Sequence, residues 1–196
     1  MFLLGLTGSI GMGKSTTAQM LVDEGCALWD ADAAVHRLYG PNGAAVAPLA
    51  QAFPEAVDAD GVSRARLKQI IASDAGALSR IERIVHPLVA ADRQTFIAQA
   101  QADIVVLDIP LLFETGGETR VDAIACVFIS DAEQERRVMA RGTMTKEQFE
   151  TIRAKQMPAQ EKCARSDYVI ETDTLEHARQ QVQNMLADIR SRLPNA

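Results

Sequence analysis

The sequence has no excess of basic residues and no long apolar run. Its 20 Lys and Arg residues are outnumbered by 26 Asp and Glu residues, which gives a formal net charge of −6. A nucleic-acid binder needs a basic surface to offset phosphate charge, so this balance argues against such a partner. No apolar run approaches the roughly 20 residues that span a bilayer, so we expect no membrane partner and a cytoplasmic location. Nothing in the sequence indicates an obligate protein partner.

Cysteine is also scarce. Cys26, Cys126 and Cys163 lie far apart and form neither a CxxC pair nor a metal-ligand spacing. This pattern suggests neither a zinc site nor a disulfide framework and predicts reduced thiols. The apolar segment Met1–Leu6 lacks a basic leader and runs directly into a glycine-rich stretch. We therefore predict a first strand here rather than a signal peptide.

The order of apolar and helical patterns predicts the fold class. With 196 residues, one main domain over residues 1–196 is expected, with room for a small insertion. Strand-like runs alternate with helical patterns, which is typical of an α/β protein with a parallel sheet flanked by helices. The predicted strands are Phe2–Thr7, Ala27–Asp30, Ile104–Asp108, Ala123–Ile129 and Tyr168–Ile170. A last helix is predicted from about Leu175 to Arg192 and should pack on the sheet.

Residues 31–101 interrupt this alternation with one helical pattern after another. Breaks are expected at residues 41–43, at Pro54, at Asp60-Gly61 and at His86-Pro87. We interpret residues 33–101 as an inserted helical subdomain that helps to hold a substrate. Further along, Ser130–Glu133 and Thr145–Gln148 both match the capping-box pattern that opens a helix.

The segment with the most chemical information is Gly8-Ser9-Ile10-Gly11-Met12-Gly13-Lys14-Ser15, which fits the phosphate-binding pattern G-x-x-x-x-G-K-[ST] in full. Gly8, Gly11 and Gly13 allow the backbone amides, that of Met12 included, to approach phosphate oxygens. Lys14 supplies charge for the β- and γ-phosphates, Ser15 supplies a hydroxyl ligand for Mg²⁺, and Thr16 is placed to reach the α-phosphate. The loop follows a predicted strand and opens a predicted helix. We therefore predict a kinase for a small molecule that uses ATP with Mg²⁺.

Phosphoryl transfer to an alcohol also needs a carboxylate near the acceptor proton. Asp32, in Asp30-Ala31-Asp32, follows the second strand at the carboxyl edge of the sheet, where open α/β sheets bind ligands. It is a candidate general base, and the alternative is a helix N-cap. Asp108 ends a buried strand and is a candidate for supporting Mg²⁺ through water; the alternative is a structural aspartate.

Two arginines suggest a mobile cover for the site. Arg137 and Arg141 lie four residues apart, on one face of the helix after the fourth strand. Arg141-Gly142 begins a polar, flexible stretch, which suits a lid over residues 136–164 whose arginine reaches the transferred phosphate. A solvated basic face is the alternative.

Together these residues resemble one family. Residues 5–15, Asp-Ala-Asp at 30–32, His86-Pro87, Asp-Ile-Pro-Leu-Leu-Phe-Glu at 108–114, Arg141, Gln156 and Asp-Tyr-Val-Ile at 167–170 are similar to the dephospho-coenzyme A kinases. The resemblance runs from residue 2 to about 192. It implies a P-loop kinase core, a helical coenzyme-binding subdomain and a short helical lid. It also implies that ATP phosphorylates the ribose 3′-hydroxyl of dephospho-coenzyme A, giving coenzyme A and ADP, the last step of coenzyme A synthesis.

The resemblance further implies roles for individual residues. Asp32 becomes the general base and Arg141 the lid arginine, with Lys14 as the third catalytic residue. The residues implied at the acceptor, besides Asp32, are Arg64, His86, Pro110, Leu111, Leu112 and Glu114. A helix-boundary histidine is the alternative for His86.

The sequence departs from the family after the last strand and before Arg64. Glu171-Thr172-Asp173-Thr174 stands where the family often has Asp-Asn-x-Gly. Ser63 replaces a frequent aspartate. Another P-loop small-molecule kinase and a non-catalytic nucleotide sensor remain alternative functions. A GTP-dependent switch would carry Asn-Lys-x-Asp after a late strand, and none is present.

Overall fold

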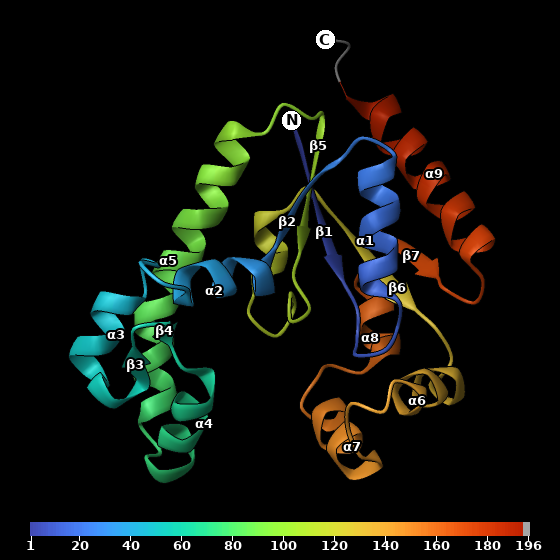
Figure 1. Ribbon diagram of the computed structural model, residues 1–196. Helices are drawn as coiled ribbons and strands as arrows, with labels where there is room; N and C mark the ends of the chain where they lie inside the picture. The colour runs from blue at the N-terminus through green and yellow to red at the C-terminus, as the bar shows by residue number, and fades with distance from the viewer. Residues whose placement is uncertain (194–196) are drawn as a thin grey trace. The chain divides into compact units, whose positions relative to one another are not determined.

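The computed structural model describes residues 1–193, which fold into two compact units (Figure 1). The first unit comprises residues 1–28 and the chain from Gln101 onward, and the second spans Trp29–Ala100. The second unit covers nearly the stretch 33–101 that the sequence analysis interpreted as an insertion. The last three residues of the predicted domain, 194–196, lie outside the described part of the chain.

A five-stranded sheet with the order β2-β5-β1-β6-β7 organises the fold. Its strands are β1 (Phe2–Thr7), β2 (Ala27–Asp30), β5 (Ile104–Asp108), β6 (Ala123–Phe128) and β7 (Tyr168–Glu171). β1 runs parallel to both β5 and β6, with Leu4 opposite Val106 on one side and Ala123 on the other. β6 is likewise parallel to β7. All five predicted strands and the parallel arrangement are confirmed.

The central strands are apolar along their whole length because both of their faces are covered. Every residue of β5, Ile-Val-Val-Leu-Asp, is buried. Leu4 and Leu6 of β1 and Ala125 and Val127 of β6 are fully buried in the same core. Continuous rather than alternating apolar sequence is what a parallel strand covered on both faces requires.

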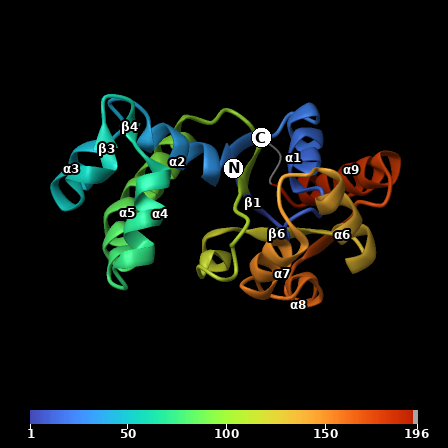
Figure 2. The ribbon, with the colours of Figure 1, turned by 60° about the horizontal axis from the view of Figure 1, so that its bottom comes forward.

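Five helices and one short 3₁₀ helix complete the described part of the first unit. They are α1 (Lys14–Asp23), α6 (Asp131–Ala140), α7 (Lys146–Ala154), α8 (Ala159–Ala164), α9 (Leu175–Arg192) and η2 (Gly117–Arg120). α1 and α9 lie side by side against the sheet, and α6, α7 and α8 gather at one end of it in both ribbon views (Figure 2). Val182, Met185, Leu186 and Ile189 of α9 are buried, as predicted.

One of the two predicted capping boxes forms. Thr145 and Gln148 cap the start of α7 reciprocally. At α6 the prediction was wrong, because the Ser130 side chain makes no capping hydrogen bond. The Glu133 carboxylate instead accepts hydrogen bonds from Arg136 and Arg137 of the same helix. Two guanidinium partners three and four residues away draw Glu133 along the helix and away from its start.

The second unit has its own core but is not purely helical. Its helices are α2 (Ala31–Tyr39), α3 (Val46–Ala52), η1 (Pro54–Ala56), α4 (Arg64–Ser73) and α5 (Ala77–Gln99). Strands β3 (Val57–Asp58) and β4 (Gly61–Val62) form an antiparallel hairpin that the sequence analysis missed. The segment Val-Asp-Ala-Asp-Gly-Val is too short to show a strand period, and the predicted break at Asp60-Gly61 is the hairpin turn itself.

The predicted break at His86-Pro87 was also wrong, since α5 continues through Pro87. Proline in a helix interior lacks one amide hydrogen bond and usually breaks or kinks the helix. Here Ile81 and Val85 before the proline are buried, and Leu88 and Val89 after it pack on the same core. This packing on both sides keeps the helix continuous and excludes a helix-boundary position for His86.

Candidate active site

The glycine-rich loop between β1 and α1 adopts a backbone that only glycine accepts easily. Gly11 and Gly13 have φ values of 78° and 89°, in the left-handed region. A Cβ atom on Gly11 would lie 2.4 Å from Cγ2 of Val138, and one on Gly13 would lie 3.1 Å from Cβ of Thr172. Both positions therefore combine a backbone requirement with a close approach of another side chain.

The start of α1 is open to an anion. Gly13 is the N-cap, no side chain caps the helix, and the first turn holds no acidic residue. Among residues 1–193, the Gly11 and Gly13 amides have no hydrogen-bond partner. Unpaired amides at a helix N-terminus, with the positive end of its dipole, favour phosphate binding.

Lys14 and Asp108 meet beside this loop. The Lys14 ammonium forms an ion pair with Oδ1 of Asp108, which ends the buried strand β5. The Asp108 side chain is 3% exposed and that of Lys14 is 17% exposed. The parallel pairing of β1 with β5 brings these residues, 94 positions apart, to the same edge of the sheet. Asp108 thus holds the loop lysine in addition to its predicted role near Mg²⁺.

The donor chemistry here suits Mg²⁺. Ser15 is exposed on the first turn of α1, and Asp108 supplies a carboxylate at the end of β5. Among residues 1–193, no group of three or more His, Cys, Asp or Glu side chains could hold a metal by itself. Mg²⁺ commonly binds through one or two protein oxygen ligands together with substrate phosphates, and this sparse donor set fits that mode.

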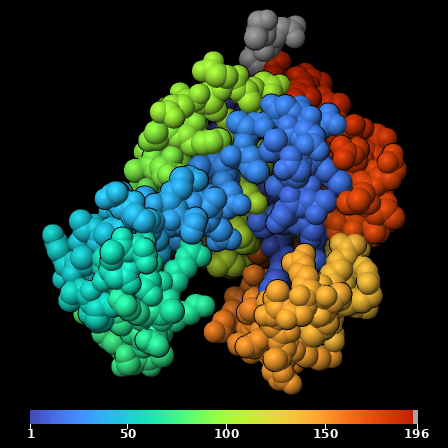
Figure 3. Space-filling model, viewed as in Figure 1, coloured from blue at the N-terminus to red at the C-terminus, as the bar shows by residue number. Residues whose placement is uncertain are grey.

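A cavity of about 270 Å³ adjoins the loop. It is lined by Gly11, Gly13, Thr16, Thr17, Met20, Arg137, Arg141 and residues 172–175 with Ala178. The cavity therefore connects the phosphate loop, the C-terminal end of α6 and the turn between β7 and α9. A second cavity of about 600 Å³ lies between Ser9 of the loop, α6 and the α7–α8 segment. Figure 3 shows residues of this segment, in orange, at the surface beside the blue N-terminal part of the unit.

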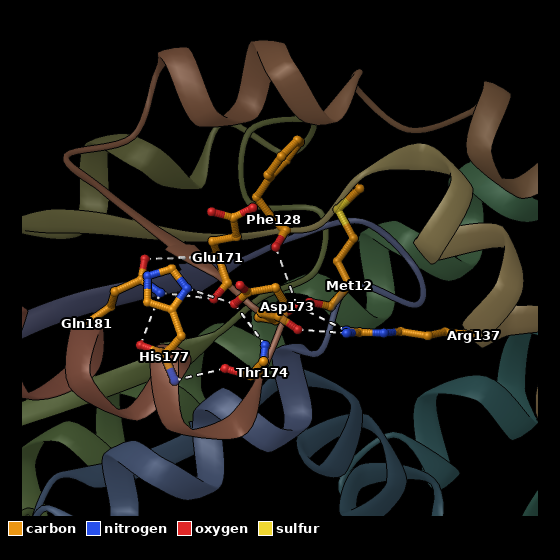
Figure 4. A network of polar contacts seen from close by, with 9 residues as sticks. Met12, Phe128, Arg137, Glu171, Asp173, Thr174, His177 and Gln181 are labelled. Carbon is orange, nitrogen blue, oxygen red and sulfur yellow. Dashed lines mark hydrogen bonds and ion pairs between the residues drawn. The ribbon is translucent and has the colours of Figure 1, made fainter.

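The two arginines of α6 differ in their surroundings. Arg141 is the exposed C-cap residue of α6. Arg137 donates to Oγ1 and to the carbonyl of Thr172 and also pairs with Glu133, so it is not part of a solvated basic face. Figure 4 shows Arg137 pointing toward the turn that follows β7. Among residues 1–193, the Arg141 side chain has no hydrogen-bond or ion-pair partner, so of the two it is the one available to a ligand.

The segment after Asp108 divides into buried and exposed residues. Leu112 is fully buried against Phe113 and Ile124, so its side chain serves the core rather than the predicted acceptor contact. Leu111 is 41% exposed. Glu114 accepts hydrogen bonds from Lys162 and from the Met157 amide, and burial of Lys162 is complete. Burial raises the pKa of Glu114, but these hydrogen bonds outweigh it and hold the pKa below its ordinary value.

The remaining predicted residues lie on the second unit. Asp30 caps α2 by accepting a hydrogen bond from the Ala33 amide, so the N-cap alternative for Asp32 was wrong. Asp32 is exposed on the first turn of α2 with no hydrogen-bond partner in the described part of its own unit. This leaves the Asp32 carboxylate available for a proton.

Arg64 and His86 are also exposed on this unit. Arg64 is the first residue of α4, and its guanidinium carbon lies 5.8 Å from the centre of the Tyr39 ring. Ser63, which stands where the family often has aspartate, caps that helix by accepting from the Arg66 amide. The capping function is therefore kept despite the substitution.

Three residues that contact the loop were given no role from the sequence. Gln134 donates to the Ile10 carbonyl, Gln156 accepts from the Ile10 amide, and Thr172 donates to the Met12 carbonyl. These contacts span 124 to 160 residues of sequence. Only the family pattern pointed to Gln156, and no local signal marks the other two.

The parallel sheet, the loop from its first strand into α1 and the Lys14–Asp108 pair define a protein of the P-loop kinase class. The sequence model described as dephospho-CoA kinase matches residues 2–177. The chain belongs to the dephospho-CoA kinase family.

Similar proteins agree with this assignment. A dephospho-CoA kinase from Ruegeria pomeroyi is 72% identical over 97% of this chain and 96% of its own length. One from Cereibacter sphaeroides is 54% identical over 96% of each chain. A solved structure from Thermus thermophilus has a TM-score of 0.83 at 32% identity, covering 99% of this chain and 98% of its own. A dephospho-CoA kinase from Campylobacter jejuni, at 20% identity and a TM-score of 0.70 over 97% and 98%, shares the fold.

Within residues 1–193, no helix combines the length and apolar character that crossing a membrane requires.

Proposed function

We propose that this protein transfers the γ-phosphate of ATP to the ribose 3′-hydroxyl of dephospho-coenzyme A, giving coenzyme A and ADP. The observation that carries the proposal is the open N-terminus of α1, with unpaired loop amides beside the Lys14–Asp108 pair. Phosphoryl transfer depends mainly on positioning and on stabilising charge around the phosphates, and this arrangement provides both.

The nucleotide is assigned to the first unit. The unpaired Gly11 and Gly13 amides, the start of α1 with Ser15 and Thr16, and the Lys14 ammonium bind the phosphates, and the 270 Å³ cavity receives the rest of the nucleotide. Mg²⁺, held by Ser15 and supported by Asp108, would neutralise phosphate charge. Arg141, exposed at the cavity, is assigned to the transferred phosphate. The lid assignment of residues 136–164 belongs to this proposal.

The acceptor roles follow the family pattern residue by residue. Asp32 takes the proton of the 3′-hydroxyl as that oxygen attacks the γ-phosphorus, because its carboxylate is exposed and not used as a cap. Arg64, His86, Pro110 and Leu111 are assigned to acceptor binding. Glu114 orders its segment through Lys162, and Leu112 anchors it in the core.

A coupled assay of ADP release with a panel of acceptors tests the proposed function. We expect turnover with dephospho-coenzyme A and almost none with AMP, shikimate or gluconate. Turnover with another acceptor alone would transfer the proposal to a different small-molecule kinase. ATP binding without acceptor-dependent ADP release would favour a nucleotide sensor.

Substitution of the proposed base tests the mechanism. Asp32→Asn should lower kcat by roughly 10²- to 10⁴-fold, because a positioned base contributes about this much, while ATP affinity persists. Asp60→Asn, at an exposed aspartate of the hairpin turn, is the matched control. An Asp32→Asn enzyme with full activity would remove Asp32 from this role.

A further inference from the structure

Side chains from later in the chain hold the carbonyl groups of the phosphate loop. The Nε2 atom of Gln134 donates to the Ile10 carbonyl at 2.7 Å, and Oγ1 of Thr172 donates to the Met12 carbonyl at 2.9 Å. Both donors are buried, with 1% of Gln134 and 8% of Thr172 exposed. We call these two residues the carbonyl clamp.

The geometry of the peptide bond gives these contacts a consequence for the amides. In a planar trans peptide unit, the C=O of one residue and the N–H of the next point in opposite directions. No cis peptide occurs among residues 1–193. A donor on the Ile10 carbonyl therefore fixes the direction of the Gly11 amide, and a donor on the Met12 carbonyl fixes that of the Gly13 amide.

The clamp itself is braced by α6. Arg137 donates through Nη1 to Oγ1 of Thr172 at 3.1 Å and through Nη2 to its carbonyl at 2.7 Å. The Thr172 hydroxyl also lies 3.4 Å from the Phe128 carbonyl, but the shorter contact assigns its single proton to Met12. The hydroxyl can then accept from Arg137 through a lone pair. Figure 4 shows this connection from Met12 through the turn after β7 to Arg137.

Local hydrogen bonds hold the turn that carries Thr172. The Thr172 amide donates to the Phe128 carbonyl on β6. Asp173 accepts from the Thr174 amide and contacts Nδ1 of His177 at 2.7 Å, while Gln181 bridges the amide and carbonyl of Glu171 (Figure 4). Such a turn can hold a hydroxyl in one position.

We propose that Thr172 and Gln134 are positioning residues for nucleotide binding, which orient the Gly13 and Gly11 amides toward the phosphates by holding the carbonyls behind them. Because glycine at 11 and 13 lets these peptide units rotate easily, fixing them costs conformational entropy. Hydrogen bonds from Gln134 and Thr172 fix the units before the nucleotide binds. The part of this inference that is tested by kinetics rests on the proposed function. It also gives Thr172 a role at the point where the sequence departs from the family's asparagine.

Two substitutions at Thr172 separate positioning from packing. Thr172→Val keeps the volume and removes the hydroxyl, whereas Thr172→Ser keeps the hydroxyl and removes a methyl group. We expect Thr172→Val to lower kcat/KM for ATP by roughly ten- to hundredfold, because a buried carbonyl loses its donor, with KM for dephospho-coenzyme A unchanged. Thr172→Ser should stay within about threefold of the wild type. A packing role predicts the opposite order.

Calorimetric titration with Mg²⁺–ADP keeps the test independent of the acceptor. Thr172→Val and Gln134→Met should each weaken ADP binding about tenfold or more. Thr95→Val, at an exposed threonine of α5, should bind ADP as the wild type does. Failure of the wild type to phosphorylate dephospho-coenzyme A would reject the proposed function and leave this binding test intact.

Thermal unfolding identifies any variant that fails to fold. If Thr172→Val does not fold, Gln134→Met carries the test through its own carbonyl. Wild-type ADP affinity in a folded Thr172→Val or Gln134→Met protein would overturn the proposal. So would a Thr172→Ser protein as impaired as Thr172→Val.

Discussion

At the scale of single residues, the site depends on a few charges placed where parallel strands end. Lys14 and Asp108 are paired at the edge of the sheet, and both are largely buried. A charge in such surroundings acts on nearby phosphates with less screening than it would in water. We therefore expect the Lys14 ammonium to stabilise the transferred phosphate more strongly than a fully solvated lysine would.

Removal of the Lys14 charge should abolish most of the activity. For Lys14→Met we expect kcat to fall by at least about 10²-fold, since preorganised charge on a transferring group is typically worth this much. Steady-state kinetics at saturating ATP measures the effect. Lys68→Met, at an exposed lysine of α4, is the control. A Lys14→Met enzyme within a few-fold of the wild type would contradict the assignment.

At the scale of elements, an ion pair with a buried cation joins α8 to the segment after β5. Lys162 of α8 is completely buried, and its ammonium reaches Glu114 at 2.9 Å and the Pro110 carbonyl at 3.0 Å. Thr7 of β1 donates to the same carbonyl. The path of the chain beyond Asp108 is therefore fixed from two sides.

Breaking this pair should cost stability. Lys162→Met leaves the partly exposed Glu114 carboxylate without its cation and the Pro110 carbonyl without this donor, so we expect a loss of about 1–3 kcal/mol. Urea unfolding at neutral pH measures the change in the free energy of unfolding. A loss below about 1 kcal/mol would show that the pair has little weight.

The same pair predicts a dependence on pH. The pKa of Glu114 is lower in the folded protein than in the unfolded chain, where it takes its ordinary value. Its stabilising contribution is therefore complete above the ordinary glutamate pKa and is lost as the pH falls through the lowered one. Glu114→Gln should lose stability at pH 7 and lose less than the wild type on acidification toward pH 3. Parallel acid sensitivity of both proteins would contradict this sign.

Pro87 offers a test of how helix α5 is held together. Proline in a helix interior costs up to about 3 kcal/mol relative to alanine. Pro87→Ala should therefore raise the free energy of unfolding by roughly 1–3 kcal/mol. A destabilised Pro87→Ala protein would show that α5 needs the proline.

Several of these elements could be predicted from the sequence, and others could not. The phosphate loop and the five strands follow from local patterns of glycine and apolar residues. Three features depend on competing partners or on packing that the local sequence does not encode. They are the missing capping bond of Ser130, the continuity of α5 and the hairpin at residues 57–62. Gln134 and Thr172 became visible only when the fold brought them to the loop.

At the scale of the whole molecule, the three cysteines have buried or partly buried thiols without a disulfide. Burial raises the pKa of Cys26 to about 11 and, with the neighbouring Cys163 thiol, that of Cys126 to about 12. Burial also raises the pKa of Cys163. Since the thiolate is the reactive form, all three should resist modification at pH 7–8.

A thiol reagent such as 5,5′-dithiobis(2-nitrobenzoate) checks this expectation. The folded protein should react slowly, and all three thiols should react at once in guanidinium chloride. The reaction is followed by absorbance. Rapid release of one equivalent from the folded protein would contradict the predicted protection.

The position of β1 in the sheet has a consequence for synthesis on the ribosome. β1 is made first, yet its two neighbours, β5 and β6, begin at Ile104 and Ala123. The emerging N-terminal strand must wait for about half of the polypeptide before it can pair, while the contiguous stretch from Trp29 to Ala100 already contains its own apolar core. The order of synthesis and the order of folding therefore differ. A nascent chain stalled before Thr172 would have its phosphate loop without the hydroxyl that holds the Met12 carbonyl.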